Sequence, residues 1–158
     1  MTQEQTAWLV SRFEDHTLPK EQWTHTAHCM VALWYCIKYP LPLAVQKIRK
    51  GIQSYNISIG GANTDTSGYH ETITLFYTTK IADYLITKGI LELTDEQIAL
   101  FLQQPFLARD YIFHFYDTGR LLSKEARRYW VSPDVPDLLH QPISPKSVSS
   151  LHGRPPAS

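Results

Sequence analysis

The segment from Lys20 to Tyr39 constrains the fold most, because its helical pattern has no continuous polar side. From Cys29 to Ile37 the residues read Cys-Met-Val-Ala-Leu-Trp-Tyr-Cys-Ile, which places apolar side chains all around a helix axis. A helix of this kind is stable only when it is surrounded on every side. The run is far shorter than the ~20 apolar residues that span a bilayer. The sequence therefore predicts a central helix over 20–38, packed within a protein core.

Helical periodicity continues along the chain, and no segment shows the sustained alternation that is typical of strands. Prolines and glycines lie between the periodic segments, and Thr94-Asp-Glu-Gln97 has the pattern of a capping box. We therefore predict an all-α fold, a single helical bundle of six to seven helices. The expected helices cover residues 3–14, 20–38, 43–57, 67–88, 95–103, 108–117 and 123–131.

The end of the chain differs in composition from the rest. Six of the ten prolines follow Val131, together with a high share of serine. Such a segment carries too little apolar surface to fold by itself. With 158 residues the chain has the length of one domain. We predict a helical domain over 1–139 and a disordered Pro/Ser-rich tail over 140–158.

Charge and cysteine content indicate which cellular compartment and which binding partners suit the chain. The 15 basic and 15 acidic residues balance, so the chain lacks the positive field that favours nucleic acid or anionic membranes. Cys29 and Cys36 would lie ~10 Å apart on one helix, too far for a disulfide. Unpaired thiols fit a reducing compartment, and the first residues lack the pattern of a signal peptide. We predict a cytoplasmic protein that binds neither nucleic acid nor membrane, and leave a homodimer open.

Two histidine motifs stand out against this background. In Trp23-Thr-His-Thr-Ala-His28, the side chains of His25 and His28 lie one turn apart on one helix face. That face continues through small residues, which leaves space beside the imidazoles. The second motif is Gly68-Tyr-His-Glu-Thr72, which brings His70 and Glu71 to the start of the next long apolar helix. If the two helices pack together, the three histidines converge.

Three histidines, or two with a carboxylate, form the ligand set of Zn²⁺ or of non-haem Fe or Mn with open positions. The sequence thus predicts a divalent metal held by His25, His28 and His70, with Glu71 as fourth ligand or as catalytic base toward metal-bound water. The expected protein is a small metal-dependent hydrolase or oxygenase. Its expected substrate is a small molecule, with an aromatic molecule as one option, bound in a pocket lined by aromatic side chains. The far nitrogen of a ligand histidine would donate a hydrogen bond to an acceptor, for which the candidates are Asp110, Asp65 and Thr74.

Three alternatives remain open at this stage. The same histidines and Glu71 can form a metal-free pocket in a non-catalytic small-ligand-binding or sensor protein. They can also be buried side chains bonded to backbone or tyrosine hydroxyl groups, in a domain whose tail recruits a partner. Cys29 beside His25 can act as a thiolate nucleophile or as a small apolar residue. The expected core consists of Leu33, Trp34, Ile48, Ile52, Phe76, Ile81, Leu85, Ile98 and Phe113.

The two motifs also carry a resemblance. Trp23-Thr-His-x-x-His28, followed by Asn63-Thr-x-x-x-Gly-Tyr-His-Glu-Thr72, resembles a family of uncharacterised conserved bacterial proteins of about this length. The resemblance extends from Phe13 to about Leu138 and leaves out the tail after His140. It implies that the two motifs belong together, and it implies no activity.

Overall fold

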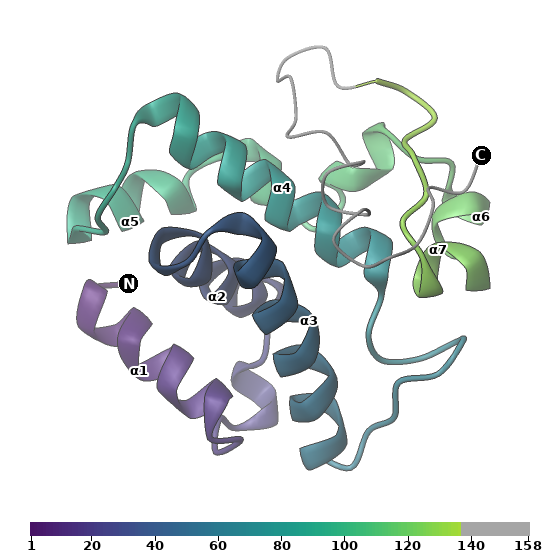
Figure 1. Cartoon of the computed structure of the whole chain (residues 1–158), viewed down its shortest axis with the longest axis horizontal. Helices are drawn as coiled ribbons and strands as arrows, with labels where there is room; N and C mark the ends of the chain where they lie inside the picture. Colours follow the sequence, from purple (N-terminus) through teal and green to yellow (C-terminus); the bar gives the residue numbers. More distant parts are fainter. Residues whose placement is uncertain (137–158) are drawn as a thin grey trace.

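The computed structural model describes residues 1–136, and within them every regular element is helical, which confirms the all-α prediction (Figure 1). Seven α-helices follow one another along the chain, with three short 3₁₀ helices, η1 to η3, between them. The α-helices are α1 (Gln3–Glu14), α2 (His25–Lys38), α3 (Leu41–Ser58), α4 (Glu71–Lys88), α5 (Asp95–Leu102), α6 (Thr118–Leu121) and α7 (Lys124–Arg128). The 3₁₀ helices are η1 (Lys20–Gln22), η2 (Pro105–Leu107) and η3 (Tyr111–His114).

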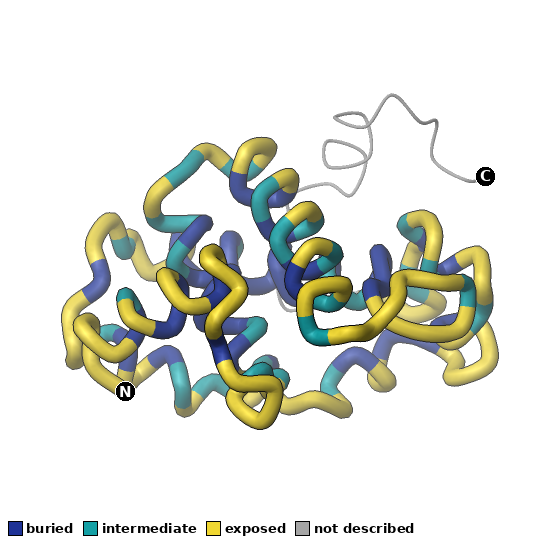
Figure 2. Tube along the Cα trace, turned by 90° about the horizontal axis from the view of Figure 1, so that it is seen from below, coloured by how far each residue is buried: buried dark blue, intermediate teal, exposed yellow. Residues whose placement is uncertain are grey.

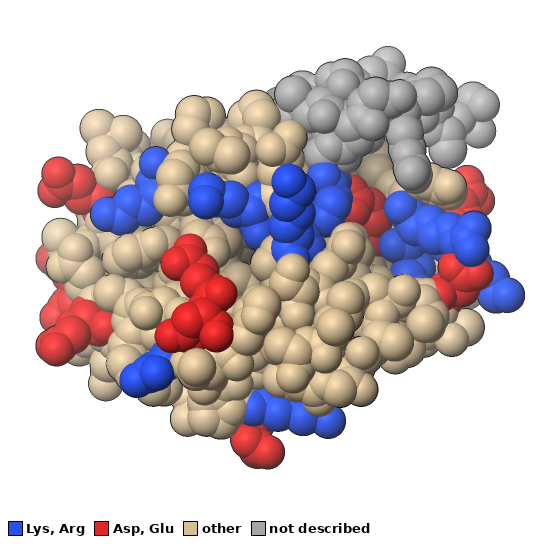
Figure 3. Space-filling view, turned by 60° about the horizontal axis from the view of Figure 1, so that its bottom comes forward, with Lys and Arg blue, Asp and Glu red and all other residues tan. Residues whose placement is uncertain are grey.

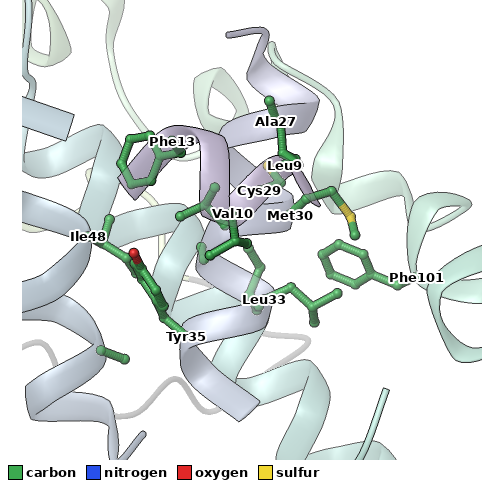
Figure 4. Close-up of a cluster of buried hydrophobic side chains, with 14 of the residues drawn as sticks. Leu9, Val10, Phe13, Ala27, Cys29, Met30, Leu33, Tyr35, Ile48 and Phe101 are labelled. Atoms are coloured by element: carbon green, nitrogen blue, oxygen red, sulfur yellow. The ribbon is translucent and has the colours of Figure 1, made fainter. Parts of the chain in front are cut away.

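Helix α2 is the centre of the main core, as its apolar pattern predicts. It packs against α1, α3 and α4, and Figure 2 shows the buried positions running through the interior of the molecule. Figure 4 shows side chains of α1 and α2 facing one another, with Phe101 of α5 beside Met30 and Leu33. Met30 and Leu33 are both fully enclosed. Helix α2 thus lies against α1, α3 and α4, and Phe101 of α5 packs beside its buried side chains.

Helix α4 joins this core to a second, smaller one. Its later residues, such as Ile81 and Leu85, belong to the main core, whereas Phe76 and Tyr77 pack against the C-terminal third of the described chain. That third supplies six buried residues to the smaller cluster: Ile112, Phe115, Tyr116, Leu121, Ala126 and Val131. Because α4 serves both clusters, its buried surface extends around most of the helix.

Two of the predicted helices begin later than expected. The segment 20–38 divides into η1 and α2, because Thr24 is extended and its hydroxyl accepts a hydrogen bond from the Ala27 N–H at 3.2 Å, which caps α2. The segment 67–88 begins only at Glu71. Gly68 has φ +80°, which ends any helical run through it, and residues 59–70 form a loop.

The C-terminal helices were predicted less well. The segment 108–117 contains only η3, and Phe113 is 44% exposed rather than part of the core. The segment 123–131 forms the short helix α7, which ends at Arg128, and α6 precedes it. Tertiary contacts hold residues 107–109 instead: side chains of α2 and α4 bind their carbonyl groups, and the Ala108 carbonyl also accepts from the Tyr111 N–H at 3.0 Å. The remaining predicted core residues are buried, except Trp34, which is half-buried.

The surface is mixed in charge. Figure 3 shows basic side chains in a band across its upper part, acidic groups at both sides and in a patch below the band, and an uncharged area beside that patch. Cys29 and Cys36 are unpaired, as predicted. Among residues 1–136, no helix combines the length and apolarity needed to cross a membrane. The predicted tail over 140–158 lies outside the described residues.

The central position of Leu33 can be tested by mutation. Leu33→Ala removes a side chain with 0% exposure and should lower the free energy of unfolding by about 2–5 kcal/mol, through lost burial and a residual cavity. Leu43→Ala makes the same change on α3 at a position that is 41% exposed, and should have little effect. Urea unfolding followed by circular dichroism measures both. Equal effects of the two variants would contradict the central burial of α2.

Candidate functional site

The amino end of α2 holds the most distinctive polar side chain, His28. Its Nδ1 lies 2.7 Å from the carbonyl oxygen of Thr24. Because a carbonyl can only accept a hydrogen bond, Nδ1 carries the proton and Nε2 keeps its lone pair. Within residues 1–136, Nε2 has no hydrogen-bond partner. The capping turn of α2 therefore presents a neutral imidazole in one tautomer.

Aromatic packing holds this ring in place and keeps it uncharged. The His28 and Trp23 ring centroids lie 3.8 Å apart, and Trp23 stacks on Phe13 at 4.6 Å. Burial lowers the pKa of His28 to about 4, and the positive charge of Arg109 acts in the same direction. At neutral pH the Nε2 atom is thus a hydrogen-bond acceptor in a fixed orientation.

His25, one turn before His28, has a different role. Its Nε2 donates to the carbonyl of Leu107 at 2.9 Å, and its ring meets Tyr77 edge-on at 4.8 Å. The Tyr77 hydroxyl in turn contacts the carbonyls of Ala108 (2.8 Å) and Arg109 (3.1 Å). Side chains of α2 and α4 thus hold three successive carbonyl groups of the segment that follows η2.

These hydrogen bonds to the carbonyls of residues 107–109 hold the backbone at Arg109 near the two histidines. Burial lowers the pKa of His25, and the charge of Arg109 lowers the pKa of both His25 and His28. The Arg109 guanidinium forms no ion pair with another described residue. The arrangement combines a neutral acceptor and a nearby cation, and no sequence pattern predicted that Arg109 lies near these histidines.

His70 lies elsewhere and uses both ring nitrogens. It caps α4, with Nδ1 accepting from the Ile73 N–H at 3.3 Å, and its Nε2 donates to the carbonyl of Leu121 at 2.9 Å. Burial lowers its pKa. His70 therefore ties the start of α4 to α6, in agreement with the alternative in which a buried histidine bonds to backbone.

Glu71 is engaged by an arginine from α3. Both carboxylate oxygens of Glu71 bind the Arg49 guanidinium, and its Oε2 lies 3.0 Å from Nε of Arg49. The Tyr69 hydroxyl also donates to Oε2 of Glu71, at 2.8 Å. The side chains of Arg49 and Glu71 are only 19% and 10% exposed. This bidentate pair joins α3 to the head of α4. Arg49 lies between two lysines in the sequence, and no local pattern distinguishes it.

The expected metal centre is not assembled. Among residues 1–136, no group of three or more His, Cys, Asp or Glu side chains is arranged to hold a metal ion. His70 faces Leu121, Glu71 faces Arg49, and Asp65 pairs with Arg128 rather than with a histidine. Of the three histidines predicted as ligands, His25 keeps a lone pair on Nδ1 and His28 keeps one on Nε2, whereas both nitrogens of His70 are used, which leaves one ligand fewer than the smallest usual set.

Cys29 lies 3.6 Å from Nε2 of His25. Burial raises the pKa of its thiol to about 12. A thiol that stays protonated at neutral pH is a poor nucleophile. Its environment therefore favours the interpretation as a small core residue over that as a nucleophile.

Comparison of the chain with protein-family models, curated proteins and solved structures found no match. The resemblance to an uncharacterised bacterial family stays a prediction. A function must therefore follow from the chemistry of the site itself.

The low pKa of His28 predicts a pH dependence of stability. The folded protein holds this pKa at about 4, whereas the unfolded chain has the ordinary value of 6.5. Between these values the unfolded state binds more protons, so stability is lost as the pH falls from about 6.5 to 4. The contribution of His28 to this loss should reach about 2–3 kcal/mol. We would measure the free energy of unfolding with urea at pH 7 and at pH 4.5. It should fall less between these two pH values in His28→Phe than in the unaltered protein. An NMR titration that gives His28 a midpoint near 6.5 would contradict this.

The ion pair between α3 and α4 makes a second prediction. Arg49→Met leaves the Glu71 carboxylate without its guanidinium and should lower the free energy of unfolding by about 3 kcal/mol, the low end for a buried pair. Arg128→Met removes the other bidentate pair, with Asp65, which is largely exposed and should matter little. Denaturant unfolding of both variants measures their free energies of unfolding. Similar small losses in the two variants would show that the Arg49–Glu71 pair does not stabilise the fold.

Proposed function

We propose that this protein binds a small organic acid at the amino end of α2, without a metal ion. His28 Nε2 accepts a hydrogen bond from an O–H or N–H group of the ligand, and Arg109 attracts its negative charge. The observation that carries the proposal is the fixed neutral tautomer of His28, whose Nε2 has no partner within the described residues.

The same features favour binding over turnover. An efficient general base has a pKa near the working pH, and His28, with a pKa of about 4, is a weak base at neutrality. As a hydrogen-bond acceptor it needs no protonation change. The proposal therefore follows the metal-free, non-catalytic alternative rather than the metal-dependent hydrolase or oxygenase.

His25 and Tyr77 act in this proposal as positioning residues. They do not reach the ligand, but they hold the carbonyls of Leu107, Ala108 and Arg109. Because these hydrogen bonds fix the backbone at Arg109, the charge of Arg109 stays close to His28. A ligand then meets an imidazole whose orientation is already fixed, which lowers the entropic cost of binding.

NMR titration of the full chain with lactate and with 4-hydroxybenzoate tests the proposal. Each probe joins a carboxylate to a hydroxyl donor, at short and long separation. We expect one of them to cause saturable shifts of the His28 ring signals and of the backbone amide signals at the start of α2, which every variant retains. His28→Phe keeps the aromatic packing on Trp23 but removes both nitrogens, and Arg109→Gln removes the charge. Each should weaken binding about tenfold, the effect of losing one hydrogen bond to a charged group.

His114→Phe is the matched control, because His114 is exposed and lies in η3. It should bind the probes like the unaltered protein. Absence of saturable shifts with both probes would refute the proposal. So would a stoichiometric zinc, iron or manganese ion in the untagged protein that His28→Phe removes, since that result would restore the metal-dependent function.

A further inference from the structure

The loop between α3 and α4 contains a second feature, a pocket of ≈ 180 Å³. Neither His28 nor Arg109 lines it. Its walls come from η1, from the end of α3 and from both ends of the loop. The lining residues are Lys20, Asn56, Ile59, Gly60, Gly61, Ala62, Ser67 and Gly68.

Four hydrogen-bond donors in the residues that line this pocket are unused within the described part of the chain. Lys20 is the single charged residue of the lining, and no carboxylate is part of it. In the part of the chain that the structure describes, neither the Lys20 ammonium nor the Ser67 hydroxyl has a hydrogen-bond partner. The backbone N–H groups of Ala62 and Gly68 are likewise unbonded there. Donors around one positive charge suit an oxyanion.

The loop that carries these donors is held in one shape. The Asn63 side chain donates to the carbonyl of Gln53 at 3.0 Å, and its Oδ1 accepts from Asn56 at 3.0 Å and from the Tyr69 N–H at 3.1 Å. Arg127 donates to the Gly68 carbonyl at 2.9 Å. These contacts tie the loop to α3 and α7, so the pocket exists before a ligand arrives.

Gly68 is required for this shape. It has φ +80°, and a Cβ atom there would lie 2.2 Å from the carbonyl oxygen of Ala62 and 2.8 Å from Oδ1 of Asn63. No side chain larger than hydrogen fits between these oxygens. A substitution at Gly68 must therefore move the loop and alter the pocket.

The size of the pocket limits its ligand. One water molecule occupies about 30 Å³, so the pocket holds a group of several heavy atoms. Sites for whole small molecules usually start at about 300 Å³. We infer that this pocket binds a single oxyanion group, a phosphate or a carboxylate, either as a free ion or as one end of a small molecule.

Titration of the ¹⁵N-labelled full chain with inorganic phosphate and, separately, with acetate tests this at pH 7 and constant ionic strength. We expect saturable shifts of the amide signals of Gly60, Gly61, Ala62, Ser67 and Gly68 with at least one ion. A response to phosphate alone assigns a phosphate group, and a response to acetate alone assigns a carboxylate. A response to both supports an oxyanion site of either kind.

Lys20→Ala should weaken this binding about tenfold, because it removes the positive charge. Lys50→Ala removes an exposed lysine of α3 outside the pocket and should bind like the unaltered chain. Gly68→Ala should also weaken binding while amide signals of the helical core keep their positions. The inference is overturned if neither ion saturates these signals, or if Lys20→Ala binds as tightly as Lys50→Ala.

Discussion

The burial of α2 on all sides is the constraint on which the rest of the structure depends. A helix without a polar face needs neighbours around its whole circumference, and α1, α3 and α4 supply them. These helices in turn bury their own apolar faces against α2. Helix α4 is then long enough to extend past this core and to receive the C-terminal segments on its first turns, where Phe76 and Tyr77 form the smaller core.

The C-terminal segments are too short to stabilise themselves, and polar side chains of the long helices hold them. His25 binds Leu107, Tyr77 binds Ala108 and Arg109, His70 binds Leu121, and the Thr72 hydroxyl binds Tyr129. Each contact gives a buried polar group its partner and gives an irregular segment a fixed place. Two histidines and one tyrosine of the long helices thus hold the short C-terminal segments in place.

Against this background His28 and the α3–α4 loop are exceptions. Both are rigid, both are held by many contacts, and yet both offer hydrogen-bonding groups that the described residues do not satisfy. His28 offers an acceptor, whereas the pocket at Lys20 offers donors. Polar groups of this kind, fixed beforehand in place, are the usual elements of a binding site. The two sites therefore differ in the chemistry of the ligand group that each would take.

Local sequence determined the helical class, the bounds of α1, the end of α4 at Gly89 and the central position of α2, because periodicity and capping are properties of neighbouring residues. It also singled out His28. It did not determine where His70 and Glu71 point, since both begin one helix and are equally able to face α2. The tertiary structure decided this: Arg49 from α3 took the carboxylate, and the Leu121 carbonyl took the imidazole. Such partners lie 22 and 51 residues away, and pairing over that distance depends on packing that no local pattern encodes.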